Sequence, residues 1–144
     1  SSGRYLMASE EGAGGSGASV AVDVWELRNE AGAWRRVRST GELLDVGVDR
    51  SGRLTTVSRD GAALTFTCWD VASGSEDVRR RTRIDGHAAR VAPDGETVAV
   101  VTSSGVDVRV PGEARARASF SAPGATVVAW SPDGRHLAVQ SALQ

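Results

Sequence analysis

The feature that most constrains this chain is a glycine-containing corner that recurs along it. The corner lies in four segments: SSGRYLMAS (1–9), DRSGRLTTVS (49–58), APDGETVAVVTS (92–103) and SPDGRHLAVQS (131–141). In each segment the glycine is followed by one or two mostly polar residues and then by an apolar, β-prone run. The four glycines are spaced 49, 43 and 39 residues apart: Gly3, Gly52, Gly95 and Gly134. A period of roughly this length is typical of a propeller blade or of a helical repeat.

The residues between the corners predict strands. The runs RLTTVS and AALTFTCWD flank an Asp60-Gly61 turn, and the runs ETVAVVT and VDVRV flank the turn residues SSG. β-branched residues dominate these runs, and helical spacing of apolar residues is not sustained in any window. The run VAVV (98–101) is apolar on both faces, which is typical of a sheet packed between other sheets. We therefore expect an all-β chain of stacked sheets.

The residues of each corner favour a tight turn for physical reasons. Pro132 presets φ for the first turn position, Asp133 can accept hydrogen bonds from the following backbone, and Gly134 tolerates positive φ. The tripeptide Pro93-Asp94-Gly95 repeats this chemistry. A calcium loop would need further Asp or Asn residues at fixed spacing, and each corner has a single Asp. We therefore expect turns here and no metal site.

Three segments resemble a WD-repeat β-propeller. The segment VVAWSPDGRHLAV resembles the first two strands of a blade, and TFTCWDVASG (65–74) resembles the third strand with its Trp69-Asp70 pair. VDVWELRNEAGAW (22–34) is similar, with Glu26 in the place of the Asp. The resemblance implies that Trp69 packs between adjacent sheets and that Asp70 helps to fix a local turn.

The resemblance implies β-propeller blades of four-stranded antiparallel sheets, about three to three and a half of them. The blade segments are expected at residues 4–38, 43–84, 88–121 and 125–141. A propeller usually needs four to eight blades, and an open arc exposes apolar faces and strand edges. We therefore expect residues 1–144 to be a segment of a larger propeller. The remaining blades would come from the rest of a longer chain or from another copy.

The composition limits which classes of partner and which cellular compartment we expect for this protein. The net charge of −1 predicts no strong attraction to nucleic acid or to a membrane. All 17 basic residues are arginine, which with the many Ala, Gly and Val residues indicates G/C-rich codons and a bacterial source. Cys68 is the single cysteine, so no intrachain disulfide forms and a reducing compartment is favoured. Without an apolar run of about 20 residues or a signal peptide, we expect a cytoplasmic protein.

Few residues suggest catalysis or cofactor binding. His87 and His136 are 49 residues apart, and no zinc spacing, nucleophile elbow or Walker motif occurs. The run GAGGSG (12–17) leads into a strand instead of a helix, so we expect a flexible loop and not a phosphate site. Cys68 alternates with Leu64 and Phe66, which predicts a buried small side chain. The sequence therefore predicts no catalytic, cofactor-binding or metal-binding residues.

The one marked charge cluster is RRRTR (79–83). We expect it on the outer strand of a blade, where solvated charges discourage edge pairing. The alternative is a basic rim that binds a partner and comprises Arg79, Arg80, Arg81 and Arg83. WRRVR (34–38) is a second basic strand that would extend this rim. No aromatic residues alternate with the arginines of RRRTR, so stacking on nucleic acid is not expected.

The resemblance implies a non-catalytic interaction or sensor propeller within a larger bacterial signalling or regulatory protein, and its partner would be a protein or peptide. A first alternative is the propeller portion of an enzyme of the peptidase or lyase type. The expected innermost strands LLDVGV, AARVA and TVVAW carry only Asp45 and Arg90 as charged residues, which offers little for acid–base chemistry. A second alternative is a half-propeller scaffold that associates with itself.

Overall fold

The structure of the chain is a computed structural model. It describes residues 5–11, 19–26 and 34–142, and within the first 40 residues it describes the side chain of Val22 alone. The described residues form thirteen strands and one short 3-10 helix. The expected all-β class is confirmed.

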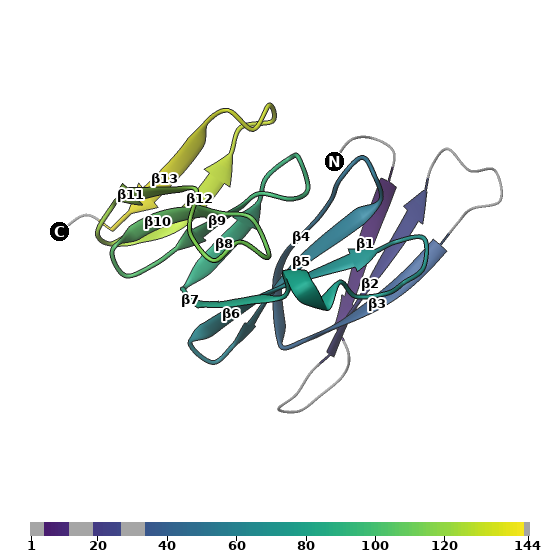
Figure 1. Cartoon of the computed structure of the whole chain (residues 1–144). Coiled ribbons are helices and arrows are strands. Elements are labelled where there is room, and N and C mark those ends of the chain that lie inside the picture. The colour runs from purple at the N-terminus through teal and green to yellow at the C-terminus, as the bar shows by residue number, and fades with distance from the viewer. Residues whose placement is uncertain (1–4, 12–18, 27–33, 143–144) are drawn as a thin grey trace.

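The strands form four antiparallel sheets that follow one another along the chain (Figure 1). The first sheet contains β1 (Tyr5–Glu11), β2 (Ser19–Glu26) and β3 (Trp34–Thr40). The second contains β4 (Glu42–Val48), β5 (Arg53–Asp60), β6 (Ala63–Asp70) and β7 (Thr82–Asp85), with the 3-10 helix η1 (Val78–Arg80) before β7. The third contains β8 (Ala88–Val91), β9 (Val98–Val101), β10 (Gly105–Arg109) and β11 (Ala118–Ser121). The fourth contains β12 (Ala125–Trp130) and β13 (Leu137–Ser141).

Every sheet is a meander, because each strand pairs with the strand next to it in sequence. Consecutive sheets are joined by short links: Gly41, residues 86–87 and residues 122–124. The first strands of the last three sheets lie close together, with β8 between β4 and β12. The described strands do not close into a ring, so the number of propeller blades stays a prediction.

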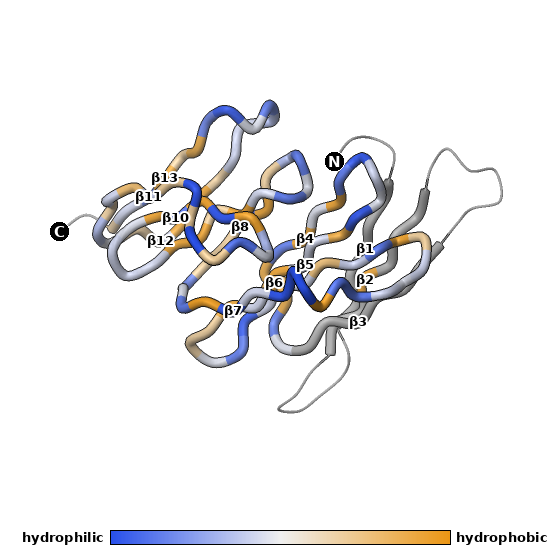
Figure 2. Tube along the Cα trace, in the orientation of Figure 1, coloured by the Kyte–Doolittle hydropathy of each residue, from blue (hydrophilic) through white to orange (hydrophobic). Residues whose placement is uncertain are grey.

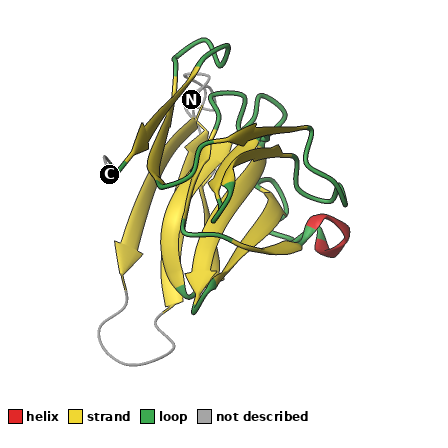
Figure 3. Ribbon diagram, turned by 90° about the vertical axis from the view of Figure 1, so that its left-hand side faces the viewer, coloured by secondary structure: helices red, strands yellow, loops and turns green. Residues whose placement is uncertain are grey.

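Apolar clusters fill the spaces between successive sheets. Apolar stretches follow the strands, and hydrophilic residues gather at the turns (Figure 2). The run 98–101 on β9 is fully buried on both faces, as expected. Val98 and Val100 pack in the cluster shared with the second sheet, whereas Ala99 and Val101 pack in the cluster shared with the fourth. The third sheet is therefore held between two others. Figure 3 shows the strands of the fold in a view turned by 90°, where they overlap in layers.

The predicted turn at Asp60-Gly61 is confirmed as a two-residue hairpin loop. Asp60 pairs with Ala63, and Gly61 and Ala62 form the loop between them. Gly61 has a φ of 63°, and no residue other than glycine has positive φ among those described. Positive φ at the first central position alone is the pattern of a type II′ turn, whose twist suits antiparallel strands.

The backbones of the second and third sheets approach each other closely at Gly95. A Cβ atom added at Gly95 would lie 2.3 Å from the carbonyl carbon of Val48 and 2.4 Å from the amide nitrogen of Asp49. The φ of Gly95 is 77°, a conformation that L side chains rarely adopt. Glycine is therefore required at this corner both for its backbone conformation and for the contact between the sheets.

We predict that Gly95→Ala lowers the free energy of unfolding by at least about 2–3 kcal/mol, because strain at positive φ adds to a backbone clash. Gly61→Ala is the matched control, since Gly61 has φ 63° but nothing lies within 4 Å of an added Cβ. The control should lose only about 1 kcal/mol. Urea denaturation followed by circular dichroism measures both values, and equal losses would contradict the close approach.

Candidate functional site: the corner groove

The corners of the last three sheets together line a hollow of about 650 Å³, which we call the corner groove. Each corner is the turn between the first and second strands of its sheet. The lining residues are 48–51 from the second sheet, 93–94 from the third and 132–133 from the fourth. Three of the four repeated corners are therefore brought together in space, with one aspartate from each: Asp49, Asp94 and Asp133. The glycine of the first corner, Gly3, lies outside the described residues.

Each of the three corners contains the same type of backbone hydrogen bond. The amide of each corner glycine donates to the carbonyl oxygen three residues earlier, at 3.2 Å for Gly52 and 2.9 Å for Gly95 and Gly134. All three glycines have positive φ. A second backbone hydrogen bond closes each corner where its two strands meet. This bond joins residues 92 and 97 in the third sheet and residues 131 and 136 in the fourth, but residues 49 and 53 in the second. The second-sheet corner is therefore one residue shorter.

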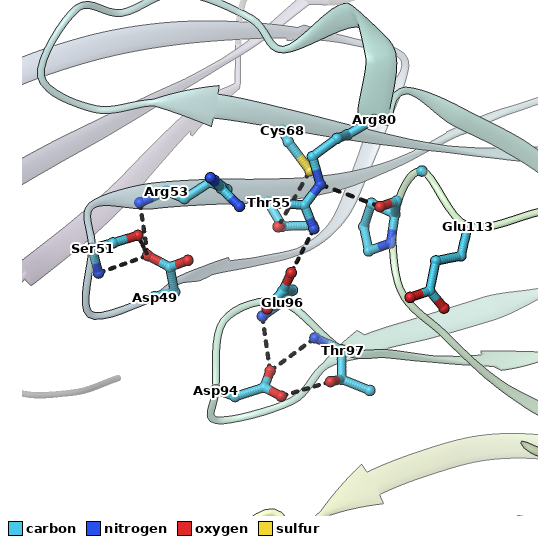
Figure 4. Close-up of polar contacts among 12 residues, drawn as sticks. Asp49, Ser51, Arg53, Thr55, Cys68, Arg80, Asp94, Glu96, Thr97 and Glu113 are labelled. Atoms are coloured by element: carbon cyan, nitrogen blue, oxygen red, sulfur yellow. Dashed lines mark hydrogen bonds and ion pairs between the residues drawn. The ribbon is translucent and has the colours of Figure 1, made fainter. Parts of the chain in front are cut away.

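The aspartate of each corner organises its own turn, as the sequence predicts. One carboxylate oxygen of Asp94 accepts the amides of Glu96 and Thr97 at 2.8 Å, and the other accepts the Thr97 hydroxyl at 2.6 Å (Figure 4). Asp49 Oδ1 accepts the amides of Ser51 and Arg53, both at 2.9 Å. The aspartate is the first residue of the short corner and the third residue of each longer corner.

The fourth-sheet corner is built in a similar way. Asp133 Oδ1 accepts the hydroxyl of Ser131 at 2.5 Å and the amide of Arg135 at 3.0 Å. The same Ser131 hydroxyl accepts the amide of His136 at 2.9 Å. Serine and aspartate side chains thus satisfy the backbone of a corner that is largely exposed to solvent.

These hydrogen bonds also set the charge of the groove. Burial opposes ionisation of Asp94, but the bonds from Thr97 and Glu96, with a smaller contribution from Arg117, outweigh it and hold the pKa of Asp94 below its ordinary value. The hydroxyl of Ser131 and the amide of Arg135 lower the pKa of Asp133. Both carboxyl groups are therefore ionised at neutral pH, and Arg50 also lines the groove.

Next to the corner groove, the innermost strands are bridged by polar contacts. Asp45 Oδ2 on β4 accepts the amide of Val91 on β8 at 2.7 Å, and Arg90 Nη1 donates to the carbonyl oxygen of Leu44 at 3.2 Å. Trp130 Nε1 on β12 donates to the carbonyl oxygen of Arg90 at 3.0 Å. Asp45 and Arg90, the two charged residues of the expected innermost strands, therefore join one sheet to the next.

The four arginines of the RRRTR cluster differ in what they contact. Arg80 turns toward the third sheet, where Nη2 contacts Glu96 Oε1 at 2.6 Å and Nε donates to the carbonyl oxygen of Pro111 at 3.3 Å (Figure 4). Arg81 forms a two-pronged ion pair with Glu76. Arg79 and Arg83 are exposed to solvent. Two of the four predicted rim arginines thus contact other residues of the chain.

The expectation that the whole cluster lies on an outer strand needs correction. Of the cluster RRRTR, Thr82 and Arg83 lie on β7, whereas Arg79 and Arg80 belong to η1 and Arg81 follows it. The 3-10 turn forms because the carboxylate of Asp77 accepts the amide of Arg79 at 3.2 Å. The partner-binding rim therefore stays a prediction that rests on Arg79 and Arg83. The WRRVR run lies on β3, where side chains are outside the described residues.

The structural roles expected of Trp69 and Asp70 are confirmed. Trp69 packs against the cluster between the first two sheets, which includes Val22 and Val48, and its Nε1 donates to Thr56 Oγ1 at 3.3 Å. Asp70 Oδ1 accepts the amide of Ala72 at 2.9 Å in the turn after β6. The pair therefore stabilises an interface between sheets and a turn.

Of the remaining candidate residues, His136 lies beside the groove, with Nδ1 4.0 Å from Asp133 Oδ1. Cys68 is fully buried as predicted, and burial raises the pKa of its thiol. The side chains of His87 and His136 are exposed. The glycine-rich run 12–17 lies outside the described residues.

No protein-family model matches the chain, and no curated protein matches its sequence. In the part of the chain that the structure describes, no three His, Cys, Asp or Glu side chains are grouped so that they could hold a metal ion. The described residues form no helix with the length and hydrophobicity that a membrane crossing requires.

We predict that Arg80→Met lowers the free energy of unfolding by about 1–2 kcal/mol, because the change leaves Glu96 and the Pro111 carbonyl without their partner. The Arg80 side chain is 16% exposed. Methionine retains much of the apolar stem, so the loss reports the polar contacts. Arg79→Met is the control and should change stability by less than about 0.5 kcal/mol. Equal effects on thermal denaturation would refute the inter-sheet role of Arg80.

We predict that the stabilising effect of Asp94 depends on pH. Because its pKa is lower in the folded state than in the unfolded state, the carboxylate stabilises the fold above the ordinary value of 3.8. This contribution is lost as the pH falls through the folded-state pKa. The stability difference between wild type and Asp94→Ala should therefore narrow below pH 3.8. Thr97→Val should show part of the effect, and parallel stability curves from pH 3 to 7 would argue against it.

Proposed function

We propose that the chain is part of a WD-repeat-like β-propeller that serves as a non-catalytic interaction module in a cytoplasmic, bacterial signalling or regulatory protein. Three features support this proposal. The sheets are antiparallel meanders, the first strands of three successive sheets lie close together, and Trp69 packs between the first two sheets. The residues of the innermost strands that could serve acid–base chemistry, Asp45 and Arg90, bridge the sheets instead.

The observation that carries the proposal is the convergence of three equivalent corners on one groove. Its volume of about 650 Å³ lies in the range of ligand-binding clefts. Turns held by a rigid scaffold are favoured positions for binding residues. The corners are rigidly supported here, because each aspartate is hydrogen-bonded to its own turn and Gly95 lies directly on the neighbouring backbone.

The lining of the groove suggests the kind of segment that binds there. The lining residues include three aspartates and one arginine, Arg50, so their charge is net negative. Pro93 and Pro132 contribute apolar surface between the charges. An extended peptide segment that presents basic side chains complements this lining, and complementary charge mainly promotes association and specificity.

We predict that a fluorescein-labelled (Gly-Arg)₃ peptide binds the wild-type chain, measured by fluorescence anisotropy, and that binding weakens as salt is added. The combined variant Asp49→Asn, Asp94→Asn and Asp133→Asn should bind about tenfold more weakly, because it removes charge but keeps an oxygen for each turn. A (Gly-Glu)₃ peptide should not bind.

The matched control for this experiment is the double variant Asp60→Asn and Asp85→Asn. Both carboxylates are exposed, and Asp60 lies at the end of β5 remote from the corner groove. This control should bind the arginine peptide almost as tightly as wild type. If the corner variant and the control bind equally well, the corner groove is not the binding surface.

A further inference from the structure

We propose that the segment bound in the corner groove also inserts one large apolar side chain into a pocket beside Trp130. This inference rests on the proposed function, because the pocket adjoins the corner groove. The pocket has a volume of about 300 Å³, and we call it the Trp130 pocket. It is lined by residues 45–48 on β4, residues 90–93 and 95 from the end of β8 and its corner, and residues 129–130 on β12.

The walls of the Trp130 pocket are fixed by packing between three consecutive sheets. Trp130 on β12 packs against the cluster between the third and fourth sheets, and its Nε1 donates to the carbonyl oxygen of Arg90 at 3.0 Å. Val91 on β8 packs against the cluster between the second and third sheets. An atom added at Gly47 on β4 would lie 2.4 Å from the Val91 side chain. The pocket is therefore preformed by these contacts.

The Trp130 pocket and the corner groove share two lining residues, Val48 and Pro93. Val48 precedes Asp49 in sequence, and Pro93 precedes Asp94. The shared residues therefore stand next to two of the three aspartates that line the groove. A segment bound along these aspartates lies beside the pocket, where one of its side chains can enter.

The polar groups of the pocket are already bonded to neighbouring sheets. Asp45 Oδ2 accepts the amide of Val91 at 2.7 Å, and Arg90 Nη1 donates to a carbonyl oxygen of β4 at 3.2 Å. The indole nitrogen of Trp130 is bonded to a carbonyl oxygen of β8. The opposite charges of Asp45 and Arg90 also leave the pocket without net charge. The surface that remains for an occupant is mainly the apolar surface of Val91, Pro93 and Trp130.

The size of the Trp130 pocket suits one side chain. Its volume of about 300 Å³ lies at the lower end of the range of ligand pockets. In protein interfaces, a few apolar side chains buried in pockets commonly carry most of the binding energy. We therefore infer a partner segment that combines basic residues for the corner groove with one leucine, phenylalanine or tryptophan for the Trp130 pocket.

Pairs of fluorescein-labelled hexapeptides test this inference. Each pair is (Gly-Arg)₃ with one arginine replaced, by leucine in one peptide and by serine in the other. The three arginine positions give three pairs, which cover the possible registers of the segment in the groove. The members of a pair carry the same charge, so their ratio of affinities reports the apolar side chain. Fluorescence anisotropy should show about a tenfold preference for leucine in at least one pair.

Two variants of Trp130 test where the leucine binds. Trp130→Ser removes the aromatic ring and should reduce the preference for leucine to less than about twofold. Trp130→Phe retains an aromatic ring but loses the indole N–H, and it should keep most of the preference. A preference that survives in Trp130→Ser would place the leucine elsewhere. Loss of the preference in Trp130→Phe as well would assign the effect to the indole hydrogen bond. Either result would overturn the inference.

A further variant keeps the inference testable if circular dichroism shows that Trp130→Ser is unfolded. Val91→Thr retains the shape of the side chain but brings a hydroxyl to the pocket wall, and it should lower the preference for leucine by about threefold. Val78→Thr is the matched control, because Val78 is 64% exposed in η1 and does not line the pocket. A full preference in both threonine variants would argue against contact between leucine and the pocket wall and would overturn the inference.

The same titrations separate this inference from the proposed function. Binding of the serine peptides reports the corner groove alone, so equal affinities within all three pairs would overturn the Trp130 pocket and leave the groove in place. Absence of binding by every peptide would overturn both. The combined Asp49→Asn, Asp94→Asn and Asp133→Asn variant should weaken both members of a pair alike. If it bound the leucine peptide as tightly as wild type, the segment would not be held in the groove, and both proposals would be overturned.

Discussion

The close approach of the innermost strands is the constraint on which the rest of the structure depends. A side chain at Gly47 would meet the Val91 side chain at 2.4 Å, and one at Gly95 would meet the backbone of Val48 at 2.3 Å. These two glycines let β4 and β8 lie side by side. That contact aligns the first strands, and the corners that follow them then meet at one end of the stack. The corner groove is a consequence of this packing.

Polar contacts between neighbouring sheets lie in two places, one beside this inner contact and one farther out. Asp45, Arg90 and Trp130 join the innermost strands through backbone groups of the neighbouring sheet. Farther out, Arg80 joins the second sheet to the third through Glu96 and Pro111. Apolar burial provides most of the driving force but does not specify direction, whereas these hydrogen bonds fix how one sheet is oriented on the next.

Much of the fold could be predicted from sequence because its signals are local. The β-branched runs, the Asp60-Gly61 turn and the aspartates of the corners each act within a few residues, and the structure confirms them. The roles of Arg80 and Asp45 could not be predicted in this way. Their partners lie 16 and 46 residues away, and no local pattern marks such a pair. The corner groove could have been anticipated by aligning the corners in register, which places one aspartate of each in a common turn.

The meander order of the sheets also has a consequence for how the chain folds during synthesis. Every strand pairs with its neighbour in sequence, and every sheet packs on the one before it. Contacts between nearby residues favour fast folding, and domains generally begin to fold from the N-terminus while the ribosome is still translating. Each sheet can therefore form as soon as its own segment has emerged and then serve as the surface for the next, so that the order of assembly follows the order of translation.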